Sequence, residues 1–129
     1  MSNKSVQTRV AKVTLDKNDV VIITMINSVD VDEEDIYDVN LVIRHLTDHK
    51  PALKLFDSRA DWKISHKAKK EAMKSDPIKT TLARAIVVSS IIKASLLSFM
   101  RKFQKKSYPQ KFFTDYDEAY NWLLSQRVK

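Results

Sequence analysis

The sequence predicts an α/β fold: a single domain with a mixed, mostly parallel sheet of about five strands and about four helices, in the order ββαβαβαβα. Short apolar runs rich in β-branched residues alternate with longer segments whose apolar residues recur at helical spacing. Helices between strands imply parallel pairing through right-handed crossovers. The length of 129 residues suits one domain, which we expect to span 1–129 with an ordered core over about 6–126.

The first two strands are expected to form a hairpin. Segment 9–15 alternates apolar and polar residues, which is typical of a half-exposed strand. A turn at 16–19 leads into 20–26, a nearly continuous apolar run that indicates a central strand. The chain has no glycine, so a turn that needs a positive φ must use Asn or Asp, and Asn18 is the expected residue.

The first helix is expected to start at Asp30, with Glu33 three residues later completing a capping box. Pro51 disfavours helical backbone at the residue before it, so this helix ends before Pro51. Segment 52–57 then indicates a short strand. A second helix follows Ser65, a suitable cap.

The second helix is expected to turn Ala68 and Ala72 toward the core. Segment 83–88 is the next predicted strand, and its uninterrupted apolar run from Ala85 to Val88 indicates burial on both faces. A third helix is predicted over 91–103 and a last short strand over 109–113. The final helix then begins after Thr114, its expected cap.

The composition excludes several classes of enzyme. Phosphate-binding loops and nucleophile elbows depend on glycine, and the absence of cysteine removes disulfides and thiolate chemistry. No apolar run is long enough for a membrane span or a signal peptide, so we expect a cytoplasmic protein. The net charge is +7, but aromatic residues are not interleaved with the lysines as a stacking platform requires. Nucleic-acid binding is therefore not expected.

No metal, cofactor or catalytic site is predicted. His45 and His49 are four residues apart and could share a helical face, but no third ligand follows at a matching spacing. Imidazoles near the C-terminus of a helix are favoured by the helix dipole without any metal ion.

Two strand ends carry polar residues that could meet a ligand or a partner. Asp57, Ser58 and Arg59 leave the carboxyl end of a predicted parallel strand, where open α/β sheets bind ligands. Ser89 and Ser90 occupy the same end of the next strand, at a helix N-terminus that could hold an anion. The alternative, which we favour, is that Asp57 and Arg59 organise a loop while one serine caps a helix.

The predicted third helix is apolar on more than one side. Beyond its inward stripe, Ile91, Leu97 and Met100 add apolar surface around the side. Monomers rarely leave such a patch open to water, so these residues are a candidate interface. A symmetric homodimer would cover them, and a bound lipid or other apolar ligand is the alternative.

Four stretches, in their order and spacing, carry a family resemblance. They are Pro51–Arg59, Ile64–Ser65 before an Ala/Lys-rich helix, Ala85–Ser90 opening an apolar helix, and Lys111–Thr114 leading to Trp122–Leu123. Together they resemble the STAS-like, sporulation anti-sigma-factor-antagonist-like domains, a family of small bacterial α/β proteins. The resemblance implies a protein-binding domain without catalysis.

Some members of that family are switched by phosphorylation of the second residue after the strand-end Asp, a serine. That position here is Arg59, followed by Ala60, so the phosphoswitch is not expected. The leading prediction is a non-enzymatic protein-interaction or regulatory module of STAS-like fold, whose partner could be a second copy of itself. The alternative is a binder of an apolar or anionic small ligand such as a lipid.

Overall fold

The computed structural model describes residues 3–74, 80–89 and 108–127 of the chain. The larger of its two sheets contains β1 (Lys4–Gln7), β2 (Ala11–Leu15), β3 (Val20–Met25), β5 (Ala52–Asp57), β7 (Thr81–Val87) and β8 (Gln110–Phe113), in this spatial order. The smaller sheet pairs β4 (Val29–Val31) with β6 (Trp62–Ile64). The helices of the described residues are α1 (Glu33–Leu46), α2 (His66–Met73) and α4 (Tyr116–Gln126).

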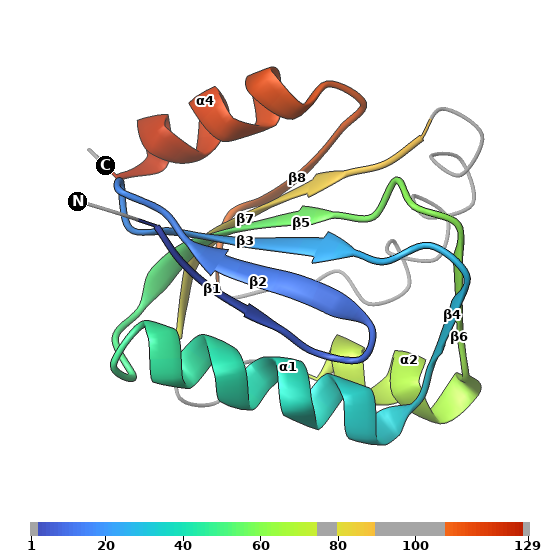
Figure 1. Ribbon diagram of the computed structural model, residues 1–129. Helices are drawn as coiled ribbons and strands as arrows, with labels where there is room; N and C mark the ends of the chain where they lie inside the picture. Colours follow the sequence, from blue (N-terminus) through green and yellow to red (C-terminus); the bar gives the residue numbers. More distant parts are fainter. Residues whose placement is uncertain (1–2, 75–79, 90–107, 128–129) are drawn as a thin grey trace.

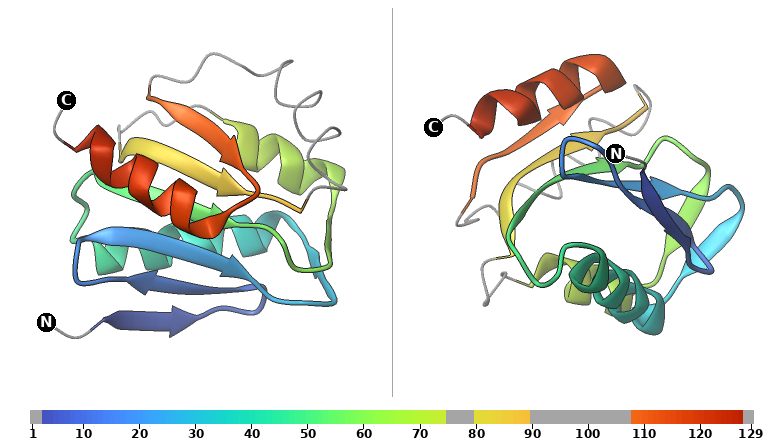
Figure 2. Two further views of the ribbon diagram at one scale, coloured as in Figure 1. Left: turned by 90° about the horizontal axis from the view of Figure 1, so that it is seen from above. Right: turned by 60° about the vertical axis from the view of Figure 1, so that its left-hand side comes forward.

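The domain has three layers. Figure 1 shows that α4 covers one face of the larger sheet, while α1 and α2 cover the other. Figure 2 shows the same layers from two further directions. The small sheet of β4 and β6 lies at the carboxyl ends of β3 and β5. The chain continues from β4 into α1 and from β6 into α2.

The strand pairing confirms a mixed, mostly parallel sheet. β2 is antiparallel to β3, whereas β3, β5, β7 and β8 are parallel neighbours. The sequence pattern does not predict β1, because its four side chains are all exposed and show no apolar alternation. Nor does it predict β4 and β6, since three residues are too few to display a period. The helix predicted over 91–103 lies outside the described residues.

Helix α1 begins after Asp32 rather than at the predicted Asp30, which lies in β4. The Asp32 carboxylate accepts the backbone N–H of Asp35 at 3.2 Å, and the Asp35 carboxylate accepts that of Asp32 at 2.9 Å. The predicted helix start is two residues too early, because several neighbouring acidic residues can cap a helix in the same way. Arg9 also donates from Nε to Asp35 Oδ1 at 3.0 Å, which holds the pKa of this carboxyl below its ordinary value.

The cap of α4 is likewise displaced by one residue. Asp115, not the predicted Thr114, accepts a backbone N–H of the first turn at 2.9 Å. Ser65 caps α2 as predicted, because its hydroxyl accepts the backbone N–H of Ala68 at 3.0 Å. Adjacent residues that can both cap are therefore the main source of error in the predicted helix starts.

The turn between β2 and β3 is joined to α4. Its positive φ of 59° belongs to Asp19 and not to the predicted Asn18. Asn18 instead donates its side-chain N–H to the Tyr120 hydroxyl at 2.8 Å, and that hydroxyl donates to the Asp16 carboxylate. The expectation that only Asn or Asp takes a positive φ is also too narrow, since Ser28 and His49 have positive φ as well.

Each face of the larger sheet has its own apolar core. Toward α1 and α2 the buried side chains include Val13, Val21, Ile23, Met25 and Ile43. Toward α4 they include Val20, Leu53, Leu55, Val87 and Leu123. Ala68 of α2 is fully buried as predicted, whereas Ala72 is exposed to solvent.

Candidate ligand-binding cavity

A polar row crosses the face of the sheet that α1 and α2 cover. Lys54 of β5 lies beside Arg84 of β7, and Arg84 lies beside Gln110 of β8. Successive side chains of a strand point to opposite faces, so Lys54 shares its face with Phe56 and not with Leu55. Lys54 is only 9% exposed. A basic side chain therefore sits in the interior, between a sheet and two helices.

An apolar row lies one step further along the same strands. Phe56 of β5 is flanked by Ile23 of β3 and Ile86 of β7. The indole of Trp62 meets the Phe56 ring edge-on, with the ring centroids 6.0 Å apart. Trp62 also donates its indole N–H to the backbone carbonyl of Ser58 at 3.1 Å, which fixes the orientation of the ring. The face thus changes from polar to apolar toward the carboxyl ends of the strands.

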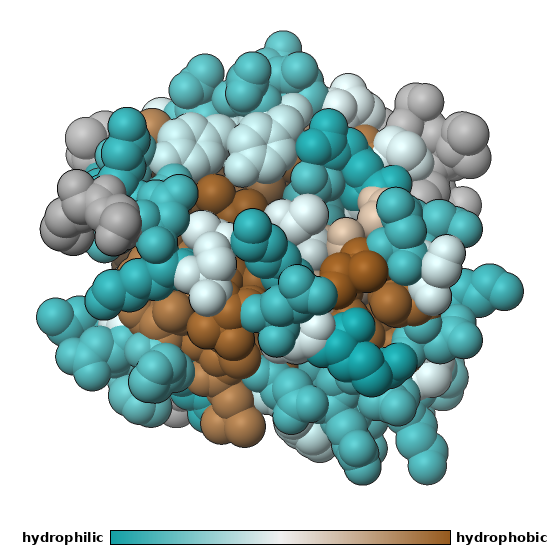
Figure 3. Space-filling model, in the orientation of Figure 1, coloured by the Kyte–Doolittle hydropathy of each residue, from teal (hydrophilic) through white to brown (hydrophobic). Residues whose placement is uncertain are grey.

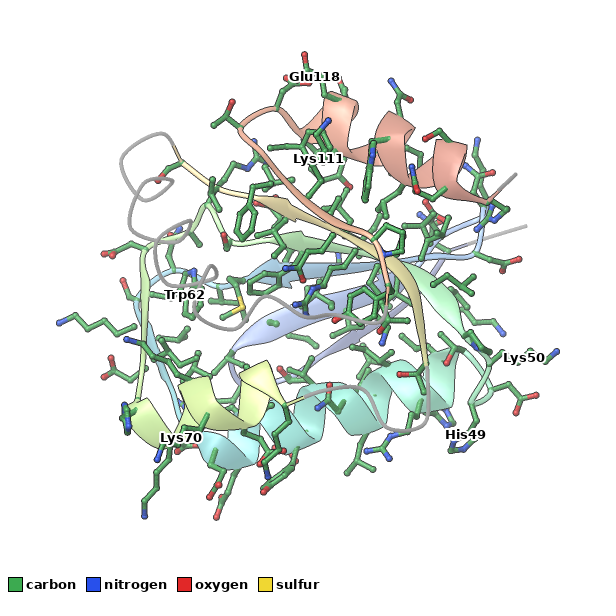
Figure 4. All side chains as sticks on the ribbon, turned by 180° about the vertical axis from the view of Figure 1, so that it is seen from behind. His49, Lys50, Trp62, Lys70, Lys111 and Glu118 are labelled. Carbon is green, nitrogen blue, oxygen red and sulfur yellow. The ribbon has the colours of Figure 1, made fainter. Side chains whose placement is uncertain are left out.

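A cavity of about 520 Å³ lies between this face and the helices α1 and α2. Among the described residues, its apolar lining includes Val10, Ile23, Met25, Val31, Ile36, Val39, Ile43, Phe56, Trp62, Ile64 and Ala72. The polar lining residues in the same part of the chain are Asn40, Arg44, Lys54, Glu71, Lys74, Thr80, Thr81, Arg84 and Tyr108. Figure 4 shows this region from behind, with Trp62 near one end of it. The volume falls within the range of small-molecule sites, about 300–1,000 Å³.

Within the described part of the chain, the polar row makes contacts with neighbouring polar side chains. Lys54 donates from Nζ to the Thr80 hydroxyl at 3.3 Å. Arg84 donates from Nε to the Gln110 side-chain carbonyl at 2.8 Å, and its guanidinium lies 5.8 Å from the centre of the Tyr108 ring. These contacts direct both basic groups along the sheet surface.

An acidic group of the lining is held by its neighbours on the helices. The Glu71 carboxylate accepts from Lys74 Nζ at 2.8 Å and from the Tyr37 hydroxyl of α1 at 3.0 Å. The bond from Lys74 lowers the pKa of Glu71, and the same contact raises the pKa of Lys74. This exposed network joins α1 to α2 at the edge of the cavity.

The predicted loop of Asp57, Ser58 and Arg59 forms one cluster at the carboxyl end of β5. The Arg59 guanidinium binds both oxygens of the Asp57 carboxylate, at 2.9 and 2.8 Å, which raises the pKa of Arg59. It also lies 5.7 Å from the centre of the Tyr116 ring, and burial raises the pKa of that phenol. Ser58 is 2% exposed and donates its hydroxyl proton to the Val87 carbonyl at 2.8 Å. These contacts organise the loop.

Ser89 lies two residues beyond the end of β7 and is half-buried. The other residues predicted for this end of the sheet and for the interface, Ser90, Ile91, Leu97 and Met100, lie outside the described residues. The candidate role of the strand-end residues in binding a ligand or a partner stays a prediction.

Sequence reasoning missed the polar row. Its signal was present, because a basic residue stands between apolar neighbours in each of two strands, at Lys54 and at Arg84. Taken alone, each of these basic residues is typical of a solvent-exposed position on a strand. Only the register between β5 and β7 shows that the two lie side by side on a covered face.

The described residues form neither a cluster of metal ligands nor a membrane-spanning helix. No group of three or more His, Cys, Asp and Glu side chains is placed to hold a metal ion in the part of the chain that the structure describes. Within the same part, no helix is both long and apolar enough to cross a membrane.

The sequence as a whole matches one family model. The model of DUF7793, a domain of unknown function, matches residues 13–127. The chain belongs to the DUF7793 family. A comparison with curated proteins finds no match for this DUF7793 chain.

A solved structure shares the fold of this DUF7793 domain. It is an uncharacterised protein of the DUF3478 family from Shewanella loihica PV-4, described as having a SpoIIAA-like fold. The TM-score is 0.58 at 15% sequence identity, over 94% of this chain and 91% of the other. The resemblance to STAS-like domains is thereby confirmed for the fold, whereas the family is DUF7793.

Proposed function

We propose that this DUF7793 domain is a non-enzymatic regulatory module that binds a small, largely apolar molecule between the larger sheet and helices α1 and α2. The observation that carries the proposal is the cavity of about 520 Å³. Among the described residues its lining combines apolar side chains with polar ones, and a concave site with both is typical of small-molecule binding.

The strand-end cluster supports a role without catalysis. A catalytic nucleophile must reach a substrate, but the Ser58 hydroxyl is buried and bonded to a backbone carbonyl. The Asp57 carboxylate is bound on both oxygens by Arg59. Both groups stabilise the loop, which leaves the cavity as the place where a ligand would act.

Filling the cavity is expected to abolish binding. Val39 lines the cavity from α1, whereas Val42 on the same helix packs against the core without lining it. Val39→Phe places a ring in the cavity, so the affinity for the neutral fluorophore N-phenyl-1-naphthylamine should fall at least about ten-fold, with the melting temperature unchanged or raised. Fluorescence titration and circular-dichroism melting measure the two effects.

Val42→Phe is the matched control for this experiment. The same added volume enters a packed region, so this variant should lose about 1–3 kcal/mol of stability and keep the affinity of the wild type. A wild-type domain that does not bind the fluorophore, or a Val39→Phe variant that binds it equally well, would overturn the proposed function.

A second candidate function is protein interaction through the outer face of α1. Tyr37 and Leu41 lie one turn apart on this face, with 45% and 60% of their surfaces exposed. Figure 3 shows apolar side chains gathered over α1 and the strands above it. Exposed apolar side chains that adjoin one another favour association, and a symmetric pair of α1 helices is the simplest arrangement.

Leu41→Asp is expected to convert such a homodimer into a folded monomer. The side chain is exposed, so the charge is tolerated once the second copy has left. Size-exclusion chromatography with light scattering measures the mass. The control is Leu82→Asp, because Leu82 of β7 is 50% exposed but lies on another element, and this variant should stay dimeric. A wild-type protein that is monomeric at high concentration contradicts this second function.

A further inference from the structure

We infer that two copies of this domain join through their β1 strands, which pair antiparallel about a two-fold axis at Val6 and merge the two larger sheets into one. The inference goes beyond the proposed function, and it uses a different surface from the outer face of α1. It is carried by the open edge of β1, by the self-complementary order of its residues and by the charges that the pairing brings together.

β1 is an edge strand, and among the described residues it pairs with β2 alone. Figure 2 shows it at the border of the larger sheet, on the side opposite β8. Edges that stay unpaired are usually protected by a proline, a bulge or an inward-pointing charge. β1 contains no proline, runs in unbroken register with β2, and has its charged residue, Lys4, at its first position. The edge is therefore suited to receive a further strand.

The pairing of β1 with β2 fixes which backbone groups of β1 point outward. The backbone N–H of Thr8 donates to the Ala11 carbonyl at 2.8 Å where the hairpin closes, and hydrogen-bonded pairs alternate along an antiparallel ladder. The N–H and C=O groups of Ser5 and Gln7 therefore point away from β2. The side-chain hydroxyls of Ser5 and Thr14 lie 2.9 Å apart, which agrees with the close approach of a non-hydrogen-bonded pair.

A second β1 strand fits this edge in a symmetric register that uses both outward residues. When Ser5 of one copy lies opposite Gln7 of the other, each such pair exchanges its backbone N–H···O=C bonds. The same register places Val6 opposite Val6 of the second copy, on the two-fold axis. Val6 is 37% exposed and lies opposite Val13, which is buried toward α1. An apolar row made of Val13 and Val6 from each copy thus crosses the interface.

Opposite charges come together at each end of the paired strands. In this register, Lys4 of one copy lies opposite Thr8 of the other. The residue after Thr8 is Arg9, which donates from Nε to Asp35 Oδ1 at 3.0 Å, so this turn adjoins the start of α1. Segment 30–38 contains six acidic residues and no basic one. The exposed Lys4 of each copy therefore lies beside an acidic segment of the other, which favours this pairing.

Gln7→Pro tests the pairing of the strands. Proline has no N–H and is tolerated on an edge strand where that N–H points outward, so the domain should stay folded. The dissociation constant of the dimer should rise at least about ten-fold, because the two-fold axis doubles the loss of a backbone bond. Gln7→Ala keeps the N–H and is the matched control, which should dimerise like the wild type. Analytical ultracentrifugation measures the dissociation constants, and circular dichroism checks the fold.

An exchange of charges tests the contact between Lys4 and the acidic segment. Lys4→Glu alone, or Glu34→Lys together with Asp38→Lys at exposed positions of α1, should weaken the dimer about ten-fold, because like charges then meet at both symmetric contacts. An equimolar mixture of the two variant proteins should restore the affinity in a mixed dimer, since each contact again joins opposite charges. Native mass spectrometry with one protein isotopically labelled detects the mixed species.

Leu41→Asp distinguishes this interface from the outer face of α1. It should leave the β1 dimer intact, because Leu41 is exposed on α1 and belongs to a different surface. A dimer that Leu41→Asp dissociates and Gln7→Pro does not, a wild-type protein that is monomeric at high concentration, or a mixture of the charge variants without mixed dimers contradicts the inference. The binding of a ligand in the cavity is tested separately by the fluorophore titration, so the proposed function stands or falls independently of these outcomes.

Discussion

Replacing Ser58 by aspartate is expected to unfold much of the protein at room temperature. Ser58 is 2% exposed, and its hydroxyl donates to the Val87 carbonyl. An aspartate carboxylate cannot donate to that oxygen, and it would stand beside the buried carboxylate of Asp57. Burying an unpaired charge costs several kcal/mol, which is comparable to the whole stability of a small domain, about 5–15 kcal/mol.

Two further variants serve as controls, and circular-dichroism melting measures the thermal stability of all three variants. Ser58→Ala removes one hydrogen bond and should lose only about 1 kcal/mol. Ser125→Asp introduces the same carboxylate at an exposed position of α4 and should melt near the wild type. A Ser58→Asp variant that melts within a few degrees of the wild type would show that this position tolerates a negative charge, and thus that a phosphate there could act as a switch.

The second large effect is expected at Leu55. Leu55→Ala opens a cavity on the α4 side of the sheet, where Leu55 is completely buried. The expected loss of stability is about 2–5 kcal/mol. For a chain of this size, that loss corresponds to a fall in melting temperature of roughly 8–20 °C.

The affinity of the folded Leu55→Ala variant for the apolar fluorophore should be unchanged. Leu55 and Lys54 are adjacent in sequence, but they point to opposite faces of β5, and only Lys54 lines the cavity. Leu124→Ala, at a partly buried position of α4, should lose less stability. A parallel loss of affinity in Leu55→Ala would show that the two faces of the sheet are coupled.

The strands that the sequence predicts well are those with a strong apolar pattern. Segment 20–26 consists almost entirely of apolar residues, and 52–57 carries apolar residues on both faces, because both faces of β3 and β5 are covered by helices. β1 lies at the edge of the sheet and buries none of its side chains, so no pattern marks it. Helix caps are misplaced where the sequence has two suitable residues in a row, as at Thr114 and Asp115.

The candidate site was less predictable for a different reason. Asp57 and Arg59 are two residues apart, so their contact could be foreseen from the sequence as the organisation of a loop. The row of Lys54 and Arg84 joins residues from two different strands, and it exists only because of the register between β5 and β7. Periodicity within one segment contains no information about register between segments.

The hydrogen bonds between the β2–β3 turn and α4 also affect the order of folding. Asn18 and Tyr120 are 102 positions apart, so their contact closes a loop that contains most of the chain. Contacts of such long separation form slowly, because loop-closure entropy is lost before they can stabilise anything. During synthesis, the hairpin emerges from the ribosome long before its partner helix does. Until α4 has been made, the apolar side of the sheet around Leu53 and Leu55 lacks this covering helix, and apolar surface exposed in this way promotes aggregation.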